Sequence, residues 1–453
     1  MDTQDKTNFG ETAMTQDTKQ MMIFKGIFNK KVVADFNGGE LSSDAGLLLI
    51  RESESQTGII SCIADVLDDK RHPGYVKHEF EQLLRQRVYQ IASGYEDAND
   101  SNELRHDPIF KIVCNKLNSP LASQPTISRF ENSISRKDLY RIAQAFVDIF
   151  ISSYKKSPKG IILDLDDTAD PTHGNQQLTL FNAFYGSYCF MPMHIYEGKS
   201  GKLVTTILRA GKRPSGKEIV MILKRIVKRI RERWPGVGII IRGDSHYGCP
   251  EVYDFCNEHN LKFVLGLTGH APMFKKAQKT IDKAKELYFK NKKPIKIFTE
   301  FYYKTNSWSS TQRVICKAEY NDKGQNVRFI VTNLKNNNRR MIYQTIYCGR
   351  GAMELMIKEH KNHLRSDKTS CSSFKANQFR LFLHSIAYVI LHNFRETCLR
   401  NTQFAKAQFD TIRLKILKLG ARVIYISTKI KVHLPTSCPY QEELYRIWQA
   451  CVT

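Results

Sequence analysis

The sequence predicts an α/β protein in which a mixed β-sheet follows an all-α N-terminal region and is interrupted by a β-rich insertion. Residues 46–150 carry apolar side chains at the spacing of amphipathic helices. Between residues 160 and 267, short apolar runs typical of strands alternate with helical patterns. Residues 268–340 are first Lys-rich and then alternate polar and apolar side chains in three runs, which predicts a further set of antiparallel strands.

Shifts in hydrophobic period and composition divide the 453 residues into six expected segments, enough chain for two to four domains of ~100–200 residues. They are a disordered tail (1–20), a helical DNA-binding region (21–155), the first part of the core (156–267), the β-rich insertion (268–340), the second part of the core (341–400) and a C-terminal basic helical region (401–453).

Composition and charge restrict the class of protein. A hydrophobic content of 42% excludes a wholly disordered chain, and 69 Lys and Arg against 45 Asp and Glu give a net charge of +24. Such a surplus predicts a polyanionic partner, nucleic acid before others. Eleven cysteines without a Cys-x-x-Cys pair favour a reducing cytoplasm over a disulfide framework. No apolar run reaches the ~18 residues of a membrane helix, and residues 1–20 lack the apolar core of a signal peptide, so we expect a cytoplasmic protein without a membrane partner.

Within the helical region, residues 121–130 have the pattern of a helix start. Ser123 is placed to cap the helix and Pro125 to occupy its first turn. Thr126, Ser128 and Arg129 would then project from that turn, where helix-turn-helix proteins contact DNA. The alternative is an ordinary capped helix within a bundle.

The core begins with three expected strands and continues as helix, strand, helix and strand. The expected elements are strands at 161–167, 188–196 and 203–208, a helix from Ser215 to Trp234, a strand at 237–242, a helix to Asn260 and a strand at 261–267. In this order the first and fourth strands are able to lie side by side and parallel, which would bring Asp166 and Asp244 together.

Carboxylates gather where two of these strands end. Asp164 and Asp166 should point to one face of the first strand and Asp167 to the other, because side chains alternate along a strand. A structural ion pair or a loop cap would account for one of them, whereas several together favour a divalent cation. Asp244 directly follows the fourth strand, the position at which open α/β sheets bind ligands.

A third chemical element is expected on a helix after the insertion. At ~100° per residue, Tyr347, Arg350, Glu354 and Lys361 fall on one helix face. Arg350 and Glu354 alone would make an ordinary i,i+4 salt bridge. Together with the strand carboxylates, Glu354 could complete a set of three acids suited to two-metal phosphoryl transfer, with Arg350 and Lys361 available to bind phosphates.

At these residues the chain resembles the DDE transposases of bacterial insertion sequences, most closely the group numbered thirteen-eighty. The resemblance covers roughly residues 35–430 and rests on motifs in a fixed order. They are Leu83-Leu-Arg-Gln-Arg87, Gly94-Tyr-Glu-Asp97, the run from Ser123 to Glu131, Leu163-Asp-Leu-Asp-Asp-Thr-Ala-Asp-Pro-Thr-His-Gly174, Gly211-Lys-Arg-Pro-Ser-Gly216, Ile241-Arg-Gly-Asp-Ser-His246 and the Tyr347, Arg350, Glu354, Lys361 signature.

The resemblance implies an RNase H-like catalytic core with Asp166, Asp244 and Glu354 as the catalytic and metal-binding triad. Asp164 and Asp167 remain alternatives for the first acid. It also implies two Mg²⁺ ions, replaceable by Mn²⁺, cleavage of double-stranded DNA at terminal inverted repeats, transfer of the freed 3′-OH to target DNA, and a homodimer that bridges two ends. Expected phosphate or DNA contacts are Tyr347, Arg350, Lys361, Arg213, Thr126, Ser128 and Arg129.

In related enzymes with a β insertion an aromatic side chain stacks on a flipped base. Trp308 is the corresponding candidate here, in a loop between strands with Lys304 and Arg313 nearby. A packing role is the alternative for this tryptophan.

Two other functions are compatible with parts of the sequence. The run from Asp164 to Thr168 also fits the start of haloacid-dehalogenase-type phosphatases, but Gly248 stands where their late metal loop needs an Asp. A catalytically inactive or domesticated DNA-binding descendant is the second alternative. The intact set of acids argues against it.

Overall fold

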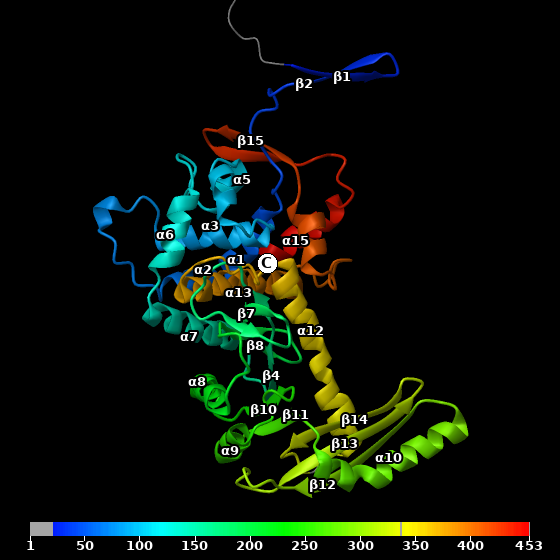
Figure 1. Ribbon diagram of the computed structural model, residues 1–453. Coiled ribbons are helices and arrows are strands. Elements are labelled where there is room, and N and C mark those ends of the chain that lie inside the picture. The colour runs from blue at the N-terminus through cyan, green and yellow to red at the C-terminus, as the bar shows by residue number, and fades with distance from the viewer. Residues whose placement is uncertain (1–20, 336–337, 453) are drawn as a thin grey trace, which may run out of the picture.

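The computed structural model describes residues 21–335 and 338–452. The expected disordered tail, residues 1–20, lies outside the described residues. Figure 1 shows an elongated molecule with helices at one end, a large sheet in the middle and further strands at the other end. In the described part of the chain, no helix is both long and apolar enough to cross a membrane.

The N-terminal region is mostly helical but starts with strands. An exposed hairpin of β1 (Met22–Ile27) and β2 (Lys30–Ala34) turns through two residues of positive φ. This pair of left-handed residues is typical of a tight hairpin turn, and the β-branched and aromatic residues on either side favour strands over the helix expected from residue 21. The helices that follow are α1 (Leu47–Thr57), α2 (Ile59–Ala64), α3 (Phe80–Ala92), α4 (Ser101–Leu104), α5 (Pro108–Val113), α6 (Gln124–Ser133) and α7 (Arg136–Ser152), with 3₁₀ turns at Pro73–Tyr75 and Ala98–Asp100.

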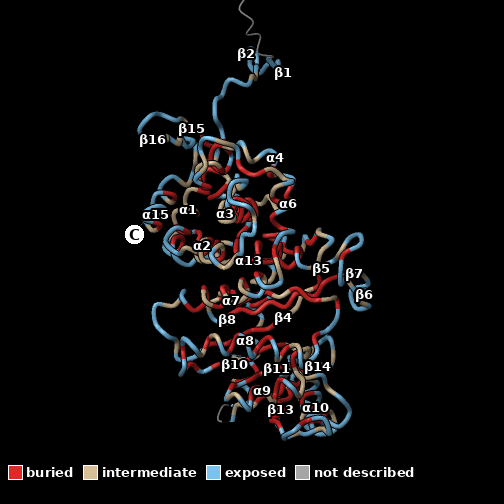
Figure 2. Tube along the Cα trace, turned by 90° about the vertical axis from the view of Figure 1, so that its left-hand side faces the viewer, coloured by how far each residue is buried: buried red, intermediate tan, exposed pale blue. Residues whose placement is uncertain are grey.

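A helix from the second half of the chain runs through the middle of this region. α13 (Phe374–Thr397) packs on α3, α6 and α7 and is buried along most of its length (Figure 2). Further C-terminal elements join the same body: α14 (Phe409–Ile412), a π-helical turn at Arg413–Leu417, β15 (Ala421–Ile426), β16 (Lys429–His433) and α15 (Gln441–Val452). β15 pairs with β3 (Leu41–Ser42) and α15 packs on α1. The helical body therefore combines both ends of the described chain.

The large sheet is mixed and has eight strands in the order β12-β13-β14-β11-β10-β4-β8-β9. Their bounds are β4 (Gly160–Asp167), β8 (Met193–Glu197), β9 (Leu203–Ile207), β10 (Gly238–Gly243), β11 (Lys262–Leu267), β12 (Ile295–Tyr303), β13 (Gln312–Asn321) and β14 (Gly324–Thr332). β4, β10 and β11 are parallel, and the other neighbours pair antiparallel. Apolar side chains of α7, α8 (Gly216–Arg233) and α9 (Pro250–Glu258) pack against the sheet.

The segment expected as one strand at 188–196 is divided between two sheets. β7 (Ser187–Phe190) pairs with β5 (Asp170–Pro171) and β6 (Leu180–Asn182) in a small sheet, whereas β8 joins the large one. Pro192 lies between them. Because proline has no N–H to donate to a ladder, it ends the first strand and allows the chain to change sheets.

The insertion extends the large sheet. Its Lys-rich part forms a long helix, α10 (Ala271–Asn291), that packs on β12 and β13. β14 pairs antiparallel with β11, with Val264 opposite Thr332. Residues 268–340 are therefore continuous with the core, and they place three more strands at its edge.

The chain after the insertion forms a rod of changing helical type. It consists of α11 (Arg339–Met341), a π-helical turn at Ile342–Tyr347, a 3₁₀ turn at Cys348–Arg350, α12 (Gly351–Lys358) and a second π-helical turn at Glu359–His363. The rotation of ~100° per residue that defines an α-helix does not hold through these π- and 3₁₀-helical turns. Short π-helical turns are frequent at functional sites.

Candidate active site

Two acidic segments meet where β4 and β10 end. Their parallel register sets Asp164 opposite Arg242 and Leu165 opposite Gly243. Asp244 follows β10 directly and so lies beside Asp166 on the neighbouring strand. We call Asp166, Asp167 and Asp244 the acidic edge. The strand pairing that would bring Asp166 and Asp244 together, expected from the order of elements, is present.

Asp164 lies on the same strand as the acidic edge but has a partner of its own. Its side chain is fully buried and accepts hydrogen bonds from Nε and Nη2 of Arg242, the second at 2.5 Å. Burial raises the pKa of Asp164 and the guanidinium opposes that shift. The Nη1 of Arg242 also donates to the carbonyl of Ile346 at 2.5 Å, and a Cβ at Gly349 would lie only 2.8 Å from that nitrogen. This buried pair therefore joins β4 and β10 to the helical rod that follows the insertion.

Asp166 lies two residues further along, near like charges. Its Oδ2 accepts a hydrogen bond of 3.0 Å from Nη1 of Arg350. Burial raises its pKa, Asp244 and Asp167 add to the shift, Arg350 opposes it, and the result is a pKa of about 7. Burial and the neighbouring carboxylates thus destabilise the charged form of Asp166, and Arg350 compensates this effect only in part.

Asp167 has partners from the segment after β10. Its Oδ1 lies 3.3 Å from Nδ1 of His246 and accepts a bond of 3.3 Å from the hydroxyl of Tyr247. Its Oδ2 is buried and has no hydrogen-bond partner in the described part of the chain. The bond to Asp167 raises the pKa of His246. A buried, unpartnered carboxylate oxygen is costly, so this position is suited to a cation or a bound donor.

Asp244 is held by its backbone surroundings. Its Oδ1 accepts the amide of His246 at 2.8 Å. Arg213 donates from Nη2 to the carbonyl of Ser245 at 2.6 Å. Gly266 on β11 lies against this turn, because a Cβ there would come within 2.7 Å of the Ser245 nitrogen. Arg213, expected at phosphates, thus also fixes the turn that carries Asp244.

Arg350 is the common neighbour of the predicted acids. Burial opposes its charge, but Asp166, Tyr347, Asp244 and Glu354 together raise its pKa. Glu354 is exposed on α12, one turn beyond it. Burial raises the pKa of Tyr347, whose hydroxyl lies beside Gly266. The helical rod therefore sets Tyr347 and Arg350 beside the acidic edge, with Glu354 exposed one turn further along as a charged neighbour of Arg350.

Lys361 contacts the loop after β4. Its Nζ donates to the carbonyl of Ala169 and, at 3.3 Å, to the hydroxyl of Thr168, and it lies 3.8 Å from the buried carboxylate of Asp170. Lys361 thus fixes the chain just beyond Asp167.

The residues expected on a DNA-reading helix lie away from the acidic edge. Thr126, Ser128 and Arg129 are on α6 in the helical body, separate from the β4–β10 edge (Figure 1). Arg129 is exposed and donates to the Thr126 hydroxyl at 3.3 Å. The structure does not bring these three residues to the acidic edge.

Trp308 is a core residue of the insertion. Only 7% of it is exposed, and its ring lies edge-on to Tyr253 at 5.3 Å and to Tyr303 at 5.8 Å between centroids. This geometry supports the packing alternative over base stacking, because both neighbouring rings already contact the indole.

The residues of the acidic edge fit a divalent cation in chemistry. Among residues 21–335 and 338–452, no three His, Cys, Asp or Glu side chains form a ready-made metal site. The unpartnered Oδ2 of Asp167 and the raised pKa of Asp166 nevertheless indicate a surplus of carboxylate over positive charge. Asp166 and Asp244 would hold the cation, with Glu354 on the facing helix as the third acid.

Sequence reasoning missed the partners that organise this site. Arg242 is a charged residue within an apolar strand, which signals a buried partner, but only the strand register identifies that partner as Asp164. Tyr247 and Gly266 were not singled out, because their roles depend on contacts between β11 and the turn after β10.

Comparison with known proteins identifies a family to which the chain is similar. Residues 24–451 match the family described as "Transposase DDE domain group 1". No curated protein matches the chain. A solved structure described as a piggyBac transposase synaptic complex with hairpin DNA is similar at 11% identity and a TM-score of 0.43, over 83% of this chain and 80% of that one.

Proposed function

The chain belongs to the DDE transposase family, domain group 1, and we propose that it cleaves DNA at the terminal inverted repeats of an insertion sequence and joins the freed 3′-OH to target DNA. The finer assignment to the group numbered thirteen-eighty rests on the resemblance of the ordered motifs given above, which end with the Tyr347, Arg350, Glu354, Lys361 signature. The order and directions of β9, β8, β4, β10 and β11 support an RNase H-like core.

One observation carries the proposal: Arg350 has all three proposed catalytic acids as electrostatic neighbours. Asp166 and Asp244 come from adjacent parallel strands and Glu354 from the helical rod. Acids from separate segments around one point suit phosphoryl transfer, which needs charge stabilisation more than a protein nucleophile.

Asp166 is our choice for the first acid. Asp164 is occupied by Arg242 within the sheet, and one oxygen of Asp167 is bound by Tyr247 and His246. Asp166 alone of the three adjoins both Asp244 and Arg350. The unpartnered oxygen of Asp167 adds to the negative charge of the same site.

Divalent cations, Mg²⁺ or Mn²⁺ in this proposal, would activate the attacking oxygen and stabilise the leaving oxygen when bound. Asp166, Asp244 and Glu354 would hold them. Arg350 donates a hydrogen bond to Asp166 in this structure, and with Asp166 bound to a cation Arg350 would be available to a phosphate. Tyr347 and Lys361 keep the helical rod in register with β11 and with the loop after β4.

The proposed partner is double-stranded DNA, with a homodimer of the protein bridging two ends. The net charge of +24 supports a phosphate-rich partner. Binding that relies on phosphate contacts should weaken steeply as salt rises. Thr126, Ser128 and Arg129 on α6 would contact DNA away from the cleavage point.

A nicking assay on inverted-repeat DNA with Mg²⁺ tests the function. Wild-type protein should nick at the repeat ends. Asp244→Asn should lose more than about a thousandfold in rate, about 4 kcal/mol of barrier, and keep its DNA affinity. Asp282→Asn on the exposed face of α10 is the matched control. DNA binding with no nicking by the wild type would favour the inactive, DNA-binding alternative.

The haloacid-dehalogenase-type alternative receives no support from the topology. Such an enzyme would need a crossover after the first strand, whereas β4 and β8 pair antiparallel. Hydrolysis of a small phosphate ester at a rate that depends on Asp164 would support the phosphatase alternative.

A further inference from the structure

A patch without charge protrudes beside the acidic edge. We call residues 178–190 the aromatic hairpin; it contains β6, β7 and the turn between them. This run has no Asp, Glu, Lys, Arg or His, in a chain where a quarter of the residues are charged. Phe181, Phe184 and Tyr188 are 57%, 88% and 58% exposed. Exposed aromatic residues so closely grouped usually mark a binding surface.

The hairpin is held in place by its backbone. β7 pairs with β5 on one side and with β6 on the other. Asn182 donates to the carbonyl of Gly211 at 3.0 Å, and a Cβ at Gly211 would lie 2.3 Å from the carbonyl oxygen of Cys189. The rings pair edge-on, Phe181 with Tyr188 at 5.5 Å and Phe184 with Tyr185 at 4.9 Å between centroids. These rings are therefore presented to solvent in fixed orientations.

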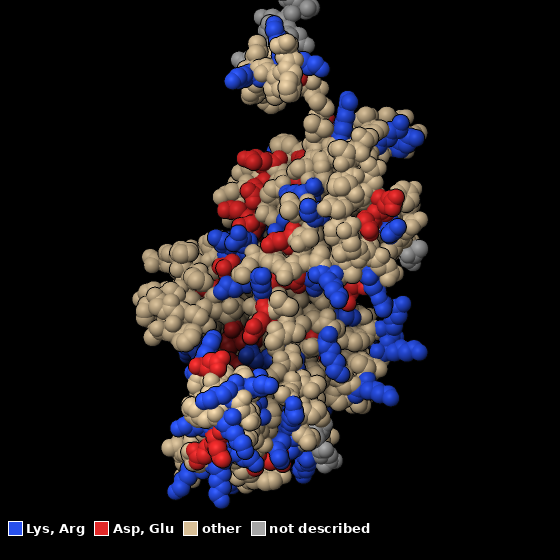
Figure 3. Space-filling model, turned by 90° about the vertical axis from the view of Figure 1, so that its right-hand side faces the viewer, with Lys and Arg blue, Asp and Glu red and all other residues tan. Residues whose placement is uncertain are grey.

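The hairpin stands at the same edge of the sheet as the acids. It connects the end of β4 to β8, and its last residue, Phe190, pairs with Asp170. Burial, and then the charges of Asp167, Asp166 and Asp244, raise the pKa of Tyr185, so this ring adjoins the acidic edge. Figure 2 shows β6 and β7 protruding from the side of the molecule. In Figure 3 a protrusion on the left is nearly free of charged residues and lies above a hollow that holds acidic atoms and is bordered by Lys and Arg.

We propose that the aromatic hairpin binds unpaired nucleobases of the DNA end that is processed at the acidic edge, with Tyr185 innermost and Phe184 outermost. The inference rests on the proposed function, since that function brings a DNA end to this point. Aromatic rings beside a cationic groove bind single strands by stacking, which tolerates any base. Arg213 lies on the loop that anchors the hairpin and supplies the cationic side.

Binding of defined oligonucleotides tests this inference on the full chain. The probes are a blunt duplex and the same duplex with a short unpaired tail that carries 2-aminopurine. Wild-type protein should prefer the tailed duplex and quench the 2-aminopurine. The double variant Phe184→Ala, Tyr185→Ala should lose about tenfold in affinity for the tailed duplex only. Phe184→Trp with Tyr185→Phe should restore both readouts.

Tyr302→Ala provides the matched control, because Tyr302 is also an exposed aromatic residue, 68% accessible on β12. An alanine double variant that retains the tail preference and the quenching overturns the inference. So does an equal loss on both duplexes, or a change of oligomeric state that accounts for the loss, since the patch would then bind duplex or protein. Melting curves of the variants exclude misfolding.

The outcomes separate this inference from the proposed function. Asp244→Asn should lose nicking and keep the tail preference. A wild-type chain that nicks no DNA but shows a hairpin-dependent tail preference would overturn the proposed function alone. A chain that nicks normally with the alanine double variant indistinguishable on tailed DNA would overturn the hairpin inference alone.

Discussion

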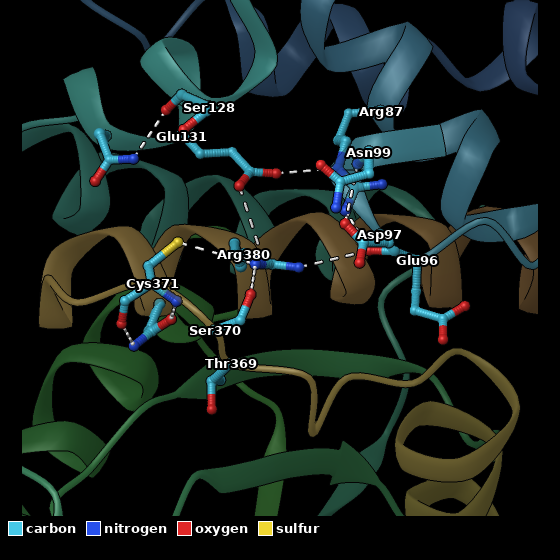
Figure 4. A network of polar contacts seen from close by, with 12 residues as sticks. Arg87, Glu96, Asp97, Asn99, Ser128, Glu131, Thr369, Ser370, Cys371 and Arg380 are labelled. Carbon is cyan, nitrogen blue, oxygen red and sulfur yellow. Dashed lines mark hydrogen bonds and ion pairs between the residues drawn. The ribbon is translucent and has the colours of Figure 1, made fainter. Parts of the chain in front are cut away.

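Two clusters of carboxylates and arginines occur in this protein, and their charge balances are opposite. In the helical body, Glu131 on α6 lies between Arg87 on α3 and Arg380 on α13 (Figure 4). We call these three residues the arginine network. Arg350, by contrast, has three carboxylates as charged neighbours, Asp166 and Asp244 of the acidic edge and Glu354 of the helical rod, and it donates a hydrogen bond to Asp166. The first cluster has two cations for one acid, and the second has one guanidinium for three acids.

The surplus charge in the arginine network is satisfied by the protein itself. Arg87 donates from Nη1 to the carbonyl of Tyr95 at 3.1 Å and from Nη2 to that of Glu96, and Arg380 donates to the hydroxyl of Ser370. All three members of the network are nearly inaccessible to solvent. The buried Nε of Arg380 has no hydrogen-bond partner among the described residues, but it lies 3.8 Å from the opposite charge of Glu131. At the acidic edge, by contrast, the unpartnered Oδ2 of Asp167 belongs to a carboxylate whose neighbour, Asp166, has the same charge. A cluster completed by its own chain serves stability, and one left incomplete is available to a ligand.

Breaking the arginine network should have the largest effect on stability. Glu131→Gln removes the acid that forms ion pairs with both Arg87 and Arg380, and it leaves these two buried guanidiniums to Asp97, whose charge acts on both without a direct ion pair. We expect a loss of about 3–5 kcal/mol, seen as a lower Tm by calorimetry. Glu103→Gln, exposed on α4, is the control. An unchanged Tm would mean that the network does not stabilise the helical body.

Removing a negative charge from the acidic edge should stabilise the protein, whereas removing one from the arginine network should destabilise it. The pKa of Asp166 is about 7 in the folded chain against an ordinary 3.8, so folding takes up a proton between these values. Stability therefore falls as pH rises through that window and stays low above it. In EDTA, Asp166→Asn should exceed the wild type by about 2–4 kcal/mol at pH 8, and the gap should close below pH 4.

Thermal melts at several pH values measure this difference. Asp282→Asn should show no such pH-dependent gap. A variant less stable than the wild type at pH 8 would show that Arg350 compensates the three carboxylates fully.

A substitution that moves Asp244 without changing the charge of the acidic edge should impair both stability and nicking. A methyl group at Gly266 would meet the Ser245 nitrogen and the hydroxyl of Tyr347. We expect Gly266→Ala to cost about 1–3 kcal/mol by overpacking. Nicking should fall with DNA binding retained, because Asp244 moves. Gly236→Ala, with open space around it, is the matched control. Full nicking activity in Gly266→Ala would mean that the site tolerates this displacement.

The smallest expected effect is stabilisation by the cation itself. Mg²⁺ at about tenfold its Kd should raise stability by about 1.4 kcal/mol, because it binds only the folded chain. Asp166→Asn should lose this gain, whereas a chain altered in the arginine network, such as Arg380→Lys, should keep it. A similar gain in both variants would place the cation elsewhere.

Much of the acidic edge was predictable because it follows from local pattern. Apolar strands linked by helical crossovers can pair in only a few ways. The strands that end near Asp166 and Asp244 were therefore expected to be neighbours, and β4 and β10 do pair in parallel. The partners of these acids were not predictable. Arg242, Tyr247 and Gly266 reach the site through register and through contacts between distant segments.

The three sequence motifs of the helical region contact one another in the fold. Leu83-Leu-Arg-Gln-Arg87, Gly94-Tyr-Glu-Asp97 and the run from Ser123 to Glu131 carried the family resemblance. In the fold, Arg87 of the first bonds carbonyls of the second and the carboxylate of the third. Three motifs far apart in the chain thus meet in one buried network. Glu131 is bound into the structure, whereas Arg129 remains free to face solvent.

The sequence by itself determined the charge of the chain, the mixed α/β class and the adjacency of two acidic strand ends, because periodicity and strand order are local properties with few solutions. Only the tertiary structure decided which acid pairs with which arginine, that Trp308 is core, that the insertion continues the sheet, and that Pro192 divides a strand between two sheets. Those outcomes depend on burial, and burial is a property of segments that meet only after folding.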